Sequence, residues 1–203
     1  MTGAFTEAGS TLIMGVDPGS QHTGYGLVLA SNHDLKLVAQ GRISPSAAWP
    51  LARRLAHIHR ELGEIAFSHR PQVVAVEDIF FGKNARSALM LGHVRGVVFL
   101  AATQAGAEVF EYAPRLVKNT VAGYGQAEKG QVARMVAELL EYRQPLAADA
   151  ADALAVAICH ASQCRVGHLL AHGGPSGTRA RGGGWRNLSM EDLTALSYKR
   201  GLK

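Results

Sequence analysis

Two apolar runs that each lead into a carboxylate constrain the fold of this chain most. The run "TLIMGV" (11–16) is followed by Asp17, and "QVVAVE" (72–77) ends on Glu77. Apolar runs of this length, bounded by glycine or proline, are typical of strands covered on both faces. If the two strands are parallel neighbours, both acids emerge at the carboxyl edge of the sheet, where ligand sites of open α/β sheets lie.

The other segments predict an α/β domain with a mixed sheet flanked by helices. The extended segments 23–30 and 35–41, joined by the turn-like "SNHD", form an antiparallel meander with 11–16. Another short strand is expected over 108–113. Helical patterns predict helices over 51–68, 85–104, 129–143 and 147–162, with a short helix opening at Pro114.

Composition separates a folded region from a basic tail. Residues 1–10 are expected to be disordered, residues 11–164 to form one α/β domain, and residues 165–203 to form a flexible basic Gly-rich tail. Residues 1–164 hold 14 Lys and Arg against 14 Asp and Glu, while 165–203 hold 7 against 2, so the +5 surplus lies in the tail. The start of the chain does not resemble a secretory signal, and no apolar run approaches a membrane span of about 18 residues. Together with two cysteines, this predicts a cytoplasmic protein.

Two further acids, Asp149 and Asp152, lie three residues apart near the start of the last predicted helix and share one face. Each acid has an ordinary structural interpretation. Asp17 fits a turn residue, Glu77 fits the first residue of a loop, and the helix pair fits a dipole-complementing first turn.

All four acids together indicate a metal site, because like charges repel by ~4 kcal/mol per pair at ~4 Å and an effective dielectric of ~20. Oxygen ligands suit Mg²⁺ or Mn²⁺, and two such ions can clamp the attacking and leaving oxygens of a phosphodiester. The glycines after Asp17 would then keep the strand edge open for a nucleic-acid backbone.

Four ordered blocks within residues 11–163 together resemble the RuvC family of bacterial Holliday-junction resolvases. The blocks are "GVDPGSQHTGYG", "VEDIFFGKNARSALMLGHVRG", "FEYAPRLVKNTVAGYGQAEKGQV" and "ADAADALAVAICH". The resemblance implies a ribonuclease H-like fold, a homodimer, and paired metal-dependent nicks on opposed strands of four-way junction DNA in recombination and repair. It also implies RuvA and RuvB as branch-migration partners. The family's catalytic, metal-binding acids fall on Asp17, Glu77, Asp149 and Asp152.

Five residues are expected to bind DNA, three of them from the same resemblance and two from their residue types. Phe80 matches a phenylalanine that stacks in the opened junction centre, although two phenylalanines after a strand also fit a core position. Lys83 and Arg86 share its loop region, which suits distorted or unpaired DNA. Lys118 and Lys129 match lysines that contact phosphates near the cut, although a single lysine is ordinarily a solvated surface charge.

The segment 85–104 is apolar on most sides and contains Gly92 and Gly96. A helix with this pattern is either a central core helix or one buried on its second side by another subunit, as a two-fold enzyme acting on a two-fold junction would require.

Three other functions fit parts of the pattern. Asp17 with its glycines resembles the phosphate loop of actin-like ATPases and sugar kinases, but those folds need two such domains and usually well over 300 residues. A junction-binding protein without catalysis would leave four acids idle. A ribonuclease H-like nuclease acting on RNA–DNA hybrids is the nearest alternative.

Overall fold

The structure is a computed structural model that describes residues 10–31, 34–78 and 85–172. Residues 1–9 and 173–203 lie outside these ranges, so the disordered N-terminus and the tail beyond residue 172 stay predictions. Residues 165–172, expected to begin the flexible tail, instead continue the last helix. The first strands are β1 (Thr11–Asp17), β2 (Thr23–Ala30) and β3 (Leu35–Ile43), which pair as the predicted antiparallel meander.

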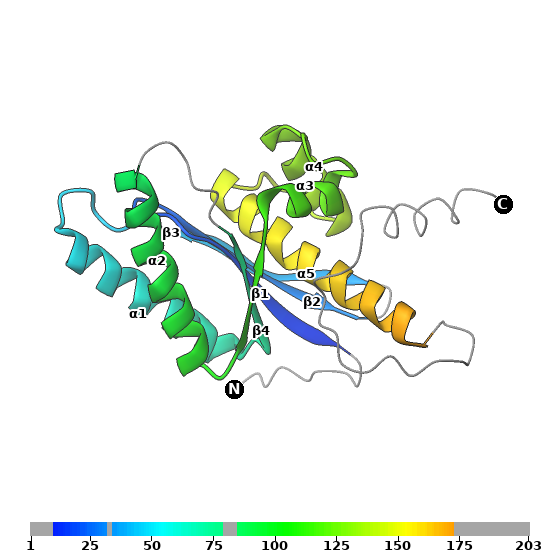
Figure 1. The fold of residues 1–203 in the computed structure, drawn as a ribbon, viewed down its shortest axis with the longest axis horizontal. Helices are drawn as coiled ribbons and strands as arrows, with labels where there is room; N and C mark the ends of the chain where they lie inside the picture. Colours follow the sequence, from blue (N-terminus) through cyan, green and yellow to red (C-terminus); the bar gives the residue numbers. More distant parts are fainter. Residues whose placement is uncertain (1–9, 32–33, 79–84, 173–203) are drawn as a thin grey trace. The chain divides into compact units, whose positions relative to one another are not determined.

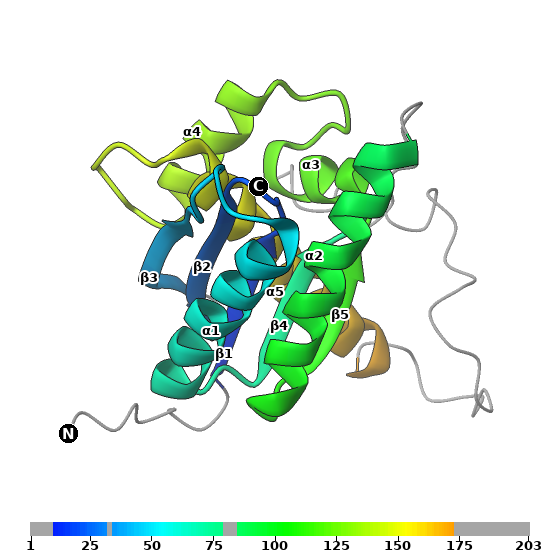
Figure 2. The same cartoon turned by 90° about the vertical axis from the view of Figure 1, so that its left-hand side faces the viewer.

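The sheet is completed by two parallel strands. β4 (Val73–Glu77) pairs parallel with β1, and β5 (Glu108–Tyr112) pairs parallel with β4, which gives the strand order β3-β2-β1-β4-β5 (Figures 1 and 2; β5 is labelled in Figure 2). Because β2 is antiparallel to both β1 and β3, the strands β1, β3, β4 and β5 all end at one edge of the sheet, and β2 begins there. The predicted mixed sheet, with its two central strands parallel, is therefore confirmed.

Helices cover both faces of the sheet (Figure 2). On one face α1 (Leu51–His69) and α2 (Ala85–Gln104) pack against Leu12, Met14 and Val16 of β1. On the other face α3 (Pro114–Ala122), α4 (Lys129–Leu139) and α5 (Ala148–His172) pack against the alternate residues of the same strands. Each central strand is thus buried on both sides, as its unbroken apolar run predicted.

Two helix ends differ from the prediction. α4 ends at Leu139 instead of continuing to 143, because Glu141 adopts a left-handed conformation with φ 50° and the amide of Tyr142 turns back to donate to the carbonyl of Ala137. α5 continues to His172, ten residues beyond its predicted end. Its extension is tied down by Arg165, whose Nη2 donates to the Ser31 carbonyl at 2.8 Å.

α2 has one side in the core and one side exposed. Val94, Val98, Ala101 and Ala102 are buried against α1 and the sheet, whereas Leu89 is 66% exposed and Leu100 50%. By length and composition alone, α2 is the one helix among the described residues that could cross a membrane. Its buried side makes it a core helix of this domain.

Candidate active site at the carboxyl edge of the sheet

Asp17 and Glu77 end two adjacent parallel strands, as their apolar runs predicted. The register pairs Val16 with Val76, so the next residue of each strand reaches the same edge. Both acids are partly buried. The backbone alone therefore fixes two carboxylates side by side at the edge where β1 and β4 end.

Close packing of α5 brings the third and fourth acids to this edge. A Cβ atom at Gly15 would lie 1.9 Å from the Ala153 carbonyl oxygen, and one at Gly24 would lie 1.9 Å from the Asp149 carbonyl oxygen. Only glycine at these positions lets the helix backbone rest on β1 and β2. The expectation that the glycines after Asp17 keep the edge open for DNA is therefore wrong for Gly24, whose missing side chain makes room for a helix.

Burial and like charge act together on these acids. The pKa of Asp17 is raised from the usual 3.8 to about 7, first by burial and then by the negative charges of Asp152 and Glu77. Burial, followed by the charge of Asp152, also raises the pKa of Glu77. Ionising these carboxylates together is costly, so the group of acids favours a bound proton or a bound cation.

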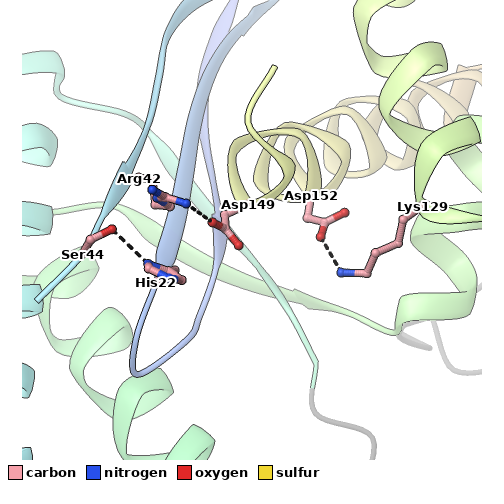
Figure 3. Close-up of polar contacts among 6 residues, drawn as sticks. All are labelled: His22, Arg42, Ser44, Lys129, Asp149 and Asp152. Atoms are coloured by element: carbon pink, nitrogen blue, oxygen red, sulfur yellow. Dashed lines mark hydrogen bonds and ion pairs between the residues drawn. The ribbon is translucent and has the colours of Figure 1, made fainter. Parts of the chain in front are cut away.

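Two basic side chains already contact two of the acids (Figure 3). Nη1 of Arg42 lies 3.4 Å from Oδ2 of Asp149, and Nζ of Lys129 donates to Oδ2 of Asp152 at 2.9 Å. Within residues 10–31, 34–78 and 85–172, no three His, Cys, Asp or Glu side chains are arranged as a ready cation cage. The donors nevertheless fit Mg²⁺ or Mn²⁺, because all four acids supply oxygen. Burial, followed by the charges of the other acids, raises the pKa of Asp17, and a cation would relieve both.

The predicted DNA-binding residues fall into two groups. Lys118 on α3 is half-buried, and its charge acts on Glu77. Lys129 is exposed at the start of α4, and Arg86 is exposed in the first turn of α2. Phe80 and Lys83 lie outside the described residues. The structure therefore brings both distant lysines to the acid edge, although they are far from Glu77 in the sequence.

Arg42 is a residue of this site that the sequence analysis missed. It lies near the end of β3, where the sequence "LKLVAQGRI" shows one arginine in a half-exposed strand. Nothing local distinguishes that arginine from a solvated surface charge. Its place beside Asp149 follows from its register opposite Gly24 and from the docking of α5, which only the tertiary structure supplies.

Comparisons with known proteins agree with this geometry. The family model described as crossover junction endodeoxyribonuclease RuvC matches residues 13–160. RuvC of Koribacter versatilis is 51% identical over 150 residues, covering 73% of this chain and 90% of that protein. RuvC of Acidobacterium capsulatum is 53% identical over 156 residues, covering 73% and 91%.

A solved structure extends the likeness to the fold. Thermus thermophilus RuvC in complex with Holliday junction substrate matches with a TM-score of 0.73 at 36% identity, covering 77% of this chain and 96% of that chain. The ribonuclease H-like mixed sheet expected from the sequence is thereby confirmed. By sequence and by fold, this chain belongs to the RuvC family of crossover junction endodeoxyribonucleases.

Proposed function

We propose that the chain resolves four-way DNA junctions with Asp17, Glu77, Asp149 and Asp152 as its catalytic centre. The observation that carries this assignment is that four carboxylates from two parallel strands and one helix reach a single sheet edge. There burial, and then the charges of the other three acids, raise the pKa of Asp17 to about 7. Partly buried carboxylates whose pKa is raised by burial and by neighbouring carboxylates, as at Asp17 and Glu77, are typical of catalytic and metal sites.

These acids are suited to hold two divalent ions, Mg²⁺ or Mn²⁺. Such ions, when bound, stabilise the charge that develops on the attacking and leaving oxygens during phosphodiester hydrolysis. The protein contributes by holding the four carboxylates in place. β1 and β4 fix Asp17 and Glu77, while the N-terminal part of α5 fixes Asp149 and Asp152.

Basic residues around the acid edge would hold the DNA backbone. Lys118 and Lys129 lie on α3 and α4, beside Glu77 and Asp152, where a phosphate near the cut would otherwise meet only negative charge. Arg86 belongs to the same proposed DNA surface, together with Phe80 and Lys83. Phosphate contacts of this kind set the position of the DNA strand and do not read its bases.

The exposed side of α2 supports a homodimer. Leu89, Gly92, Gly96 and Leu100 recur at helical spacing, the leucines are exposed, and a Cβ at either glycine would meet no atom within 4 Å. Two copies of this stripe would form a two-fold interface that matches the symmetry of the junction. RuvA and RuvB remain expected partners in the cytoplasm through the family resemblance alone.

The dimer proposal is tested by Leu100→Glu, which places a charge on the exposed stripe and should give a folded monomer by sedimentation. Val97→Glu is a poorer probe, because Val97 packs against the core. A folded Leu100→Glu dimer with full activity would remove this stripe from the interface.

The catalytic proposal is tested with Asp17→Asn, Glu77→Gln, Asp149→Asn and Asp152→Asn on a labelled four-way junction with Mg²⁺. Each variant should lose cleavage yet bind the junction as well as or better than the parent, because a negative charge facing phosphates is removed. Asp78→Asn is the matched control, since Asp78 directly follows Glu77 but pairs with Arg95 at 3.3 Å.

Two results would contradict the proposal. Parallel loss of binding and cleavage would mean that the acids hold the fold, and equal cleavage of an RNA–DNA hybrid under the same salt would favour the rival nuclease activity.

A further inference from the structure

Arg42 reaches the acid edge from the strand farthest from Glu77. It pairs with Gly24 across β2 and β3, so its side chain lies on the sheet face that carries α5, and Gly24 places no side chain in between. Nη1 of Arg42 therefore reaches Oδ2 of Asp149 at 3.4 Å (Figure 3). The contact joins residues 107 positions apart in the sequence.

The Arg42–Asp149 ion pair is suited to be replaced by a contact between Arg42 and a phosphate. The Arg42 and Asp149 side chains are 47% and 28% exposed, and pairs between partly exposed groups contribute little to stability. A guanidinium binds phosphate with the same planar donors that it offers to a carboxylate. The neighbouring end of β3 is also polar, because Nδ1 of His22 and Oγ of Ser44 lie 3.0 Å apart beside Arg42.

The charge of Arg42 also opposes a cation. A divalent ion that approaches Asp149 meets a positive guanidinium on the same carboxylate, whereas a DNA phosphate attracts both the guanidinium and the ion. Lys129 stands in the same relation to Asp152 on the other side of the site. Two of the four acids thus each contact a basic side chain in this structure.

We infer that Arg42 holds the Asp149 carboxylate in the DNA-free protein and transfers to a DNA phosphate on binding, so that full metal loading of the acids depends on DNA. This inference rests on the proposed role of Asp149 as a metal ligand. Its consequence is that the enzyme binds the second ion weakly until a strand lies in the site, which couples metal affinity to substrate.

The first test measures Mn²⁺ binding to the DNA-free protein from the electron paramagnetic resonance signal of free Mn²⁺. Arg42→Gln should raise the affinity about 3- to 10-fold, because a unit charge next to one ligand is removed in a partly solvated site. Arg42→Lys keeps the charge and should stay within about twofold of the parent. Arg60→Gln is the matched control, since Arg60 pairs with Glu61 at 2.7 Å on α1, on the other face of the sheet.

The second test measures the Mg²⁺ concentration that gives half-maximal single-turnover cleavage of a bound junction. Here Arg42→Gln should stay within about twofold of the parent, because the phosphate already neutralises the guanidinium in the parent complex. The factor by which DNA raises metal affinity therefore shrinks in Arg42→Gln and is kept in Arg42→Lys.

Several outcomes would overturn the inference. A fall in DNA-free Mn²⁺ affinity would make Arg42 a residue that orients Asp149 for metal, and an unchanged affinity would leave it without influence on the site. Equal effects of Arg42→Gln and Arg42→Lys, or of Arg60→Gln, would show that the charge beside Asp149 is not the cause.

The variant Asp149→Asn separates this inference from the proposed function. If Asp149→Asn lowers Mn²⁺ affinity while Arg42→Gln leaves it unchanged, only the exchange fails. If Asp149→Asn itself leaves Mn²⁺ affinity unchanged, the assignment of Asp149 as a ligand fails. Thermal unfolding of each variant without metal checks that the fold is kept.

Discussion

The N-terminal part of α5 and the middle of the same helix differ in the surroundings of their titratable side chains. In the N-terminal part Asp149 and Asp152 are partly exposed, and each contacts a basic side chain. In the middle His160 is 2% exposed, and burial lowers its pKa from 6.5 to about 4. The N-terminal part of the helix brings charged side chains to the sheet edge, and the middle of the helix keeps a buried imidazole neutral.

The difference comes from the partners that the fold offers. His160 has uncharged partners, with Oη of Tyr112 at 2.7 Å from Nδ1 and Sγ of Cys164 at 3.3 Å from Nε2. Both ring nitrogens of the neutral imidazole therefore have hydrogen-bond partners, and no unbalanced charge remains that a cation would neutralise. Asp149 and Asp152, by contrast, face the carboxylates of Asp17 and Glu77. The repulsion among these four acids is relieved by a bound proton or a bound cation. A buried titratable group thus indicates chemistry where its neighbours repel it.

The largest expected effect comes from Gly24→Ala, which would displace the first turn of α5 and with it the carboxylate of Asp149. The new Cβ would lie 1.9 Å from the Asp149 carbonyl oxygen, and a helix backbone cannot move aside cheaply. We expect cleavage to fall by about 100-fold or more and unfolding free energy to fall by about 2–4 kcal/mol. Junction cleavage and denaturant unfolding measure the two effects.

The control for Gly24→Ala is Gly63→Ala in α1, where a Cβ would meet no atom within 4 Å. It should leave cleavage unchanged and stabilise the protein slightly, by about 0.5–1 kcal/mol. Normal cleavage by Gly24→Ala would show that α5 can shift without disturbing its acids.

The next effect is a pH dependence of the metal-free protein set by Asp17. The folded protein binds this proton more tightly than the unfolded chain, whose pKa is near 3.8, so ionisation opposes folding. In EDTA the unfolding free energy should therefore fall as pH rises from 3.8 to about 7. The full contribution is about 4 kcal/mol at most. Thermal unfolding across this range measures it.

Added Mg²⁺ should flatten this pH profile, and Asp17→Asn should abolish its Asp17 component in EDTA. If unfolding free energy in EDTA depends on pH in the same way for the parent and for Asp17→Asn, the raised pKa of Asp17 is contradicted. Asp17 would then not interact electrostatically with the other acids.

The middle of α5 predicts a pH effect of the opposite sign. Because the folded pKa of His160 lies near 4 and its unfolded value near 6.5, stability is present above pH 6.5 and is lost as pH falls towards 4. The raised pKa values of Asp17 and Glu77 mask this trend in the parent protein. In the double variant Asp17→Asn, Glu77→Gln without metal, stability should thus decrease on acidification below pH 6.5, and an increase there would contradict the neutral assignment of His160.

The smallest effect is expected from Tyr112→Phe, which tests whether the middle of α5 serves stability alone while its N-terminal part serves cleavage. It removes the hydroxyl that contacts Nδ1 of His160 and leaves a buried ring nitrogen unsatisfied. Stability should fall by about 1–2 kcal/mol, while junction cleavage stays within about twofold of the parent. A stable Tyr112→Phe protein that has lost cleavage would extend the functional site to the middle of the helix.

Local sequence determined much of this protein. The unbroken apolar runs before Asp17 and Glu77 predicted two central strands, and the spacing of Asp149 and Asp152 predicted one shared helix face. These features depend on residues that are close together in the chain, because strand and helix periodicity act over a few positions. The four sequence blocks then indicated the family.

Tertiary structure decided the contacts between distant segments. The docking of α5 on β1 and β2 requires the missing side chain of Gly24 and brings Asp152 to Lys129. Together with the register of β3 on β2, it also places Arg42 beside Asp149. No local pattern encodes these contacts, because cross-strand register and helix docking depend on packing over the whole sheet. The sequence alone therefore indicated which acids meet, and only the tertiary structure showed which basic residues they meet.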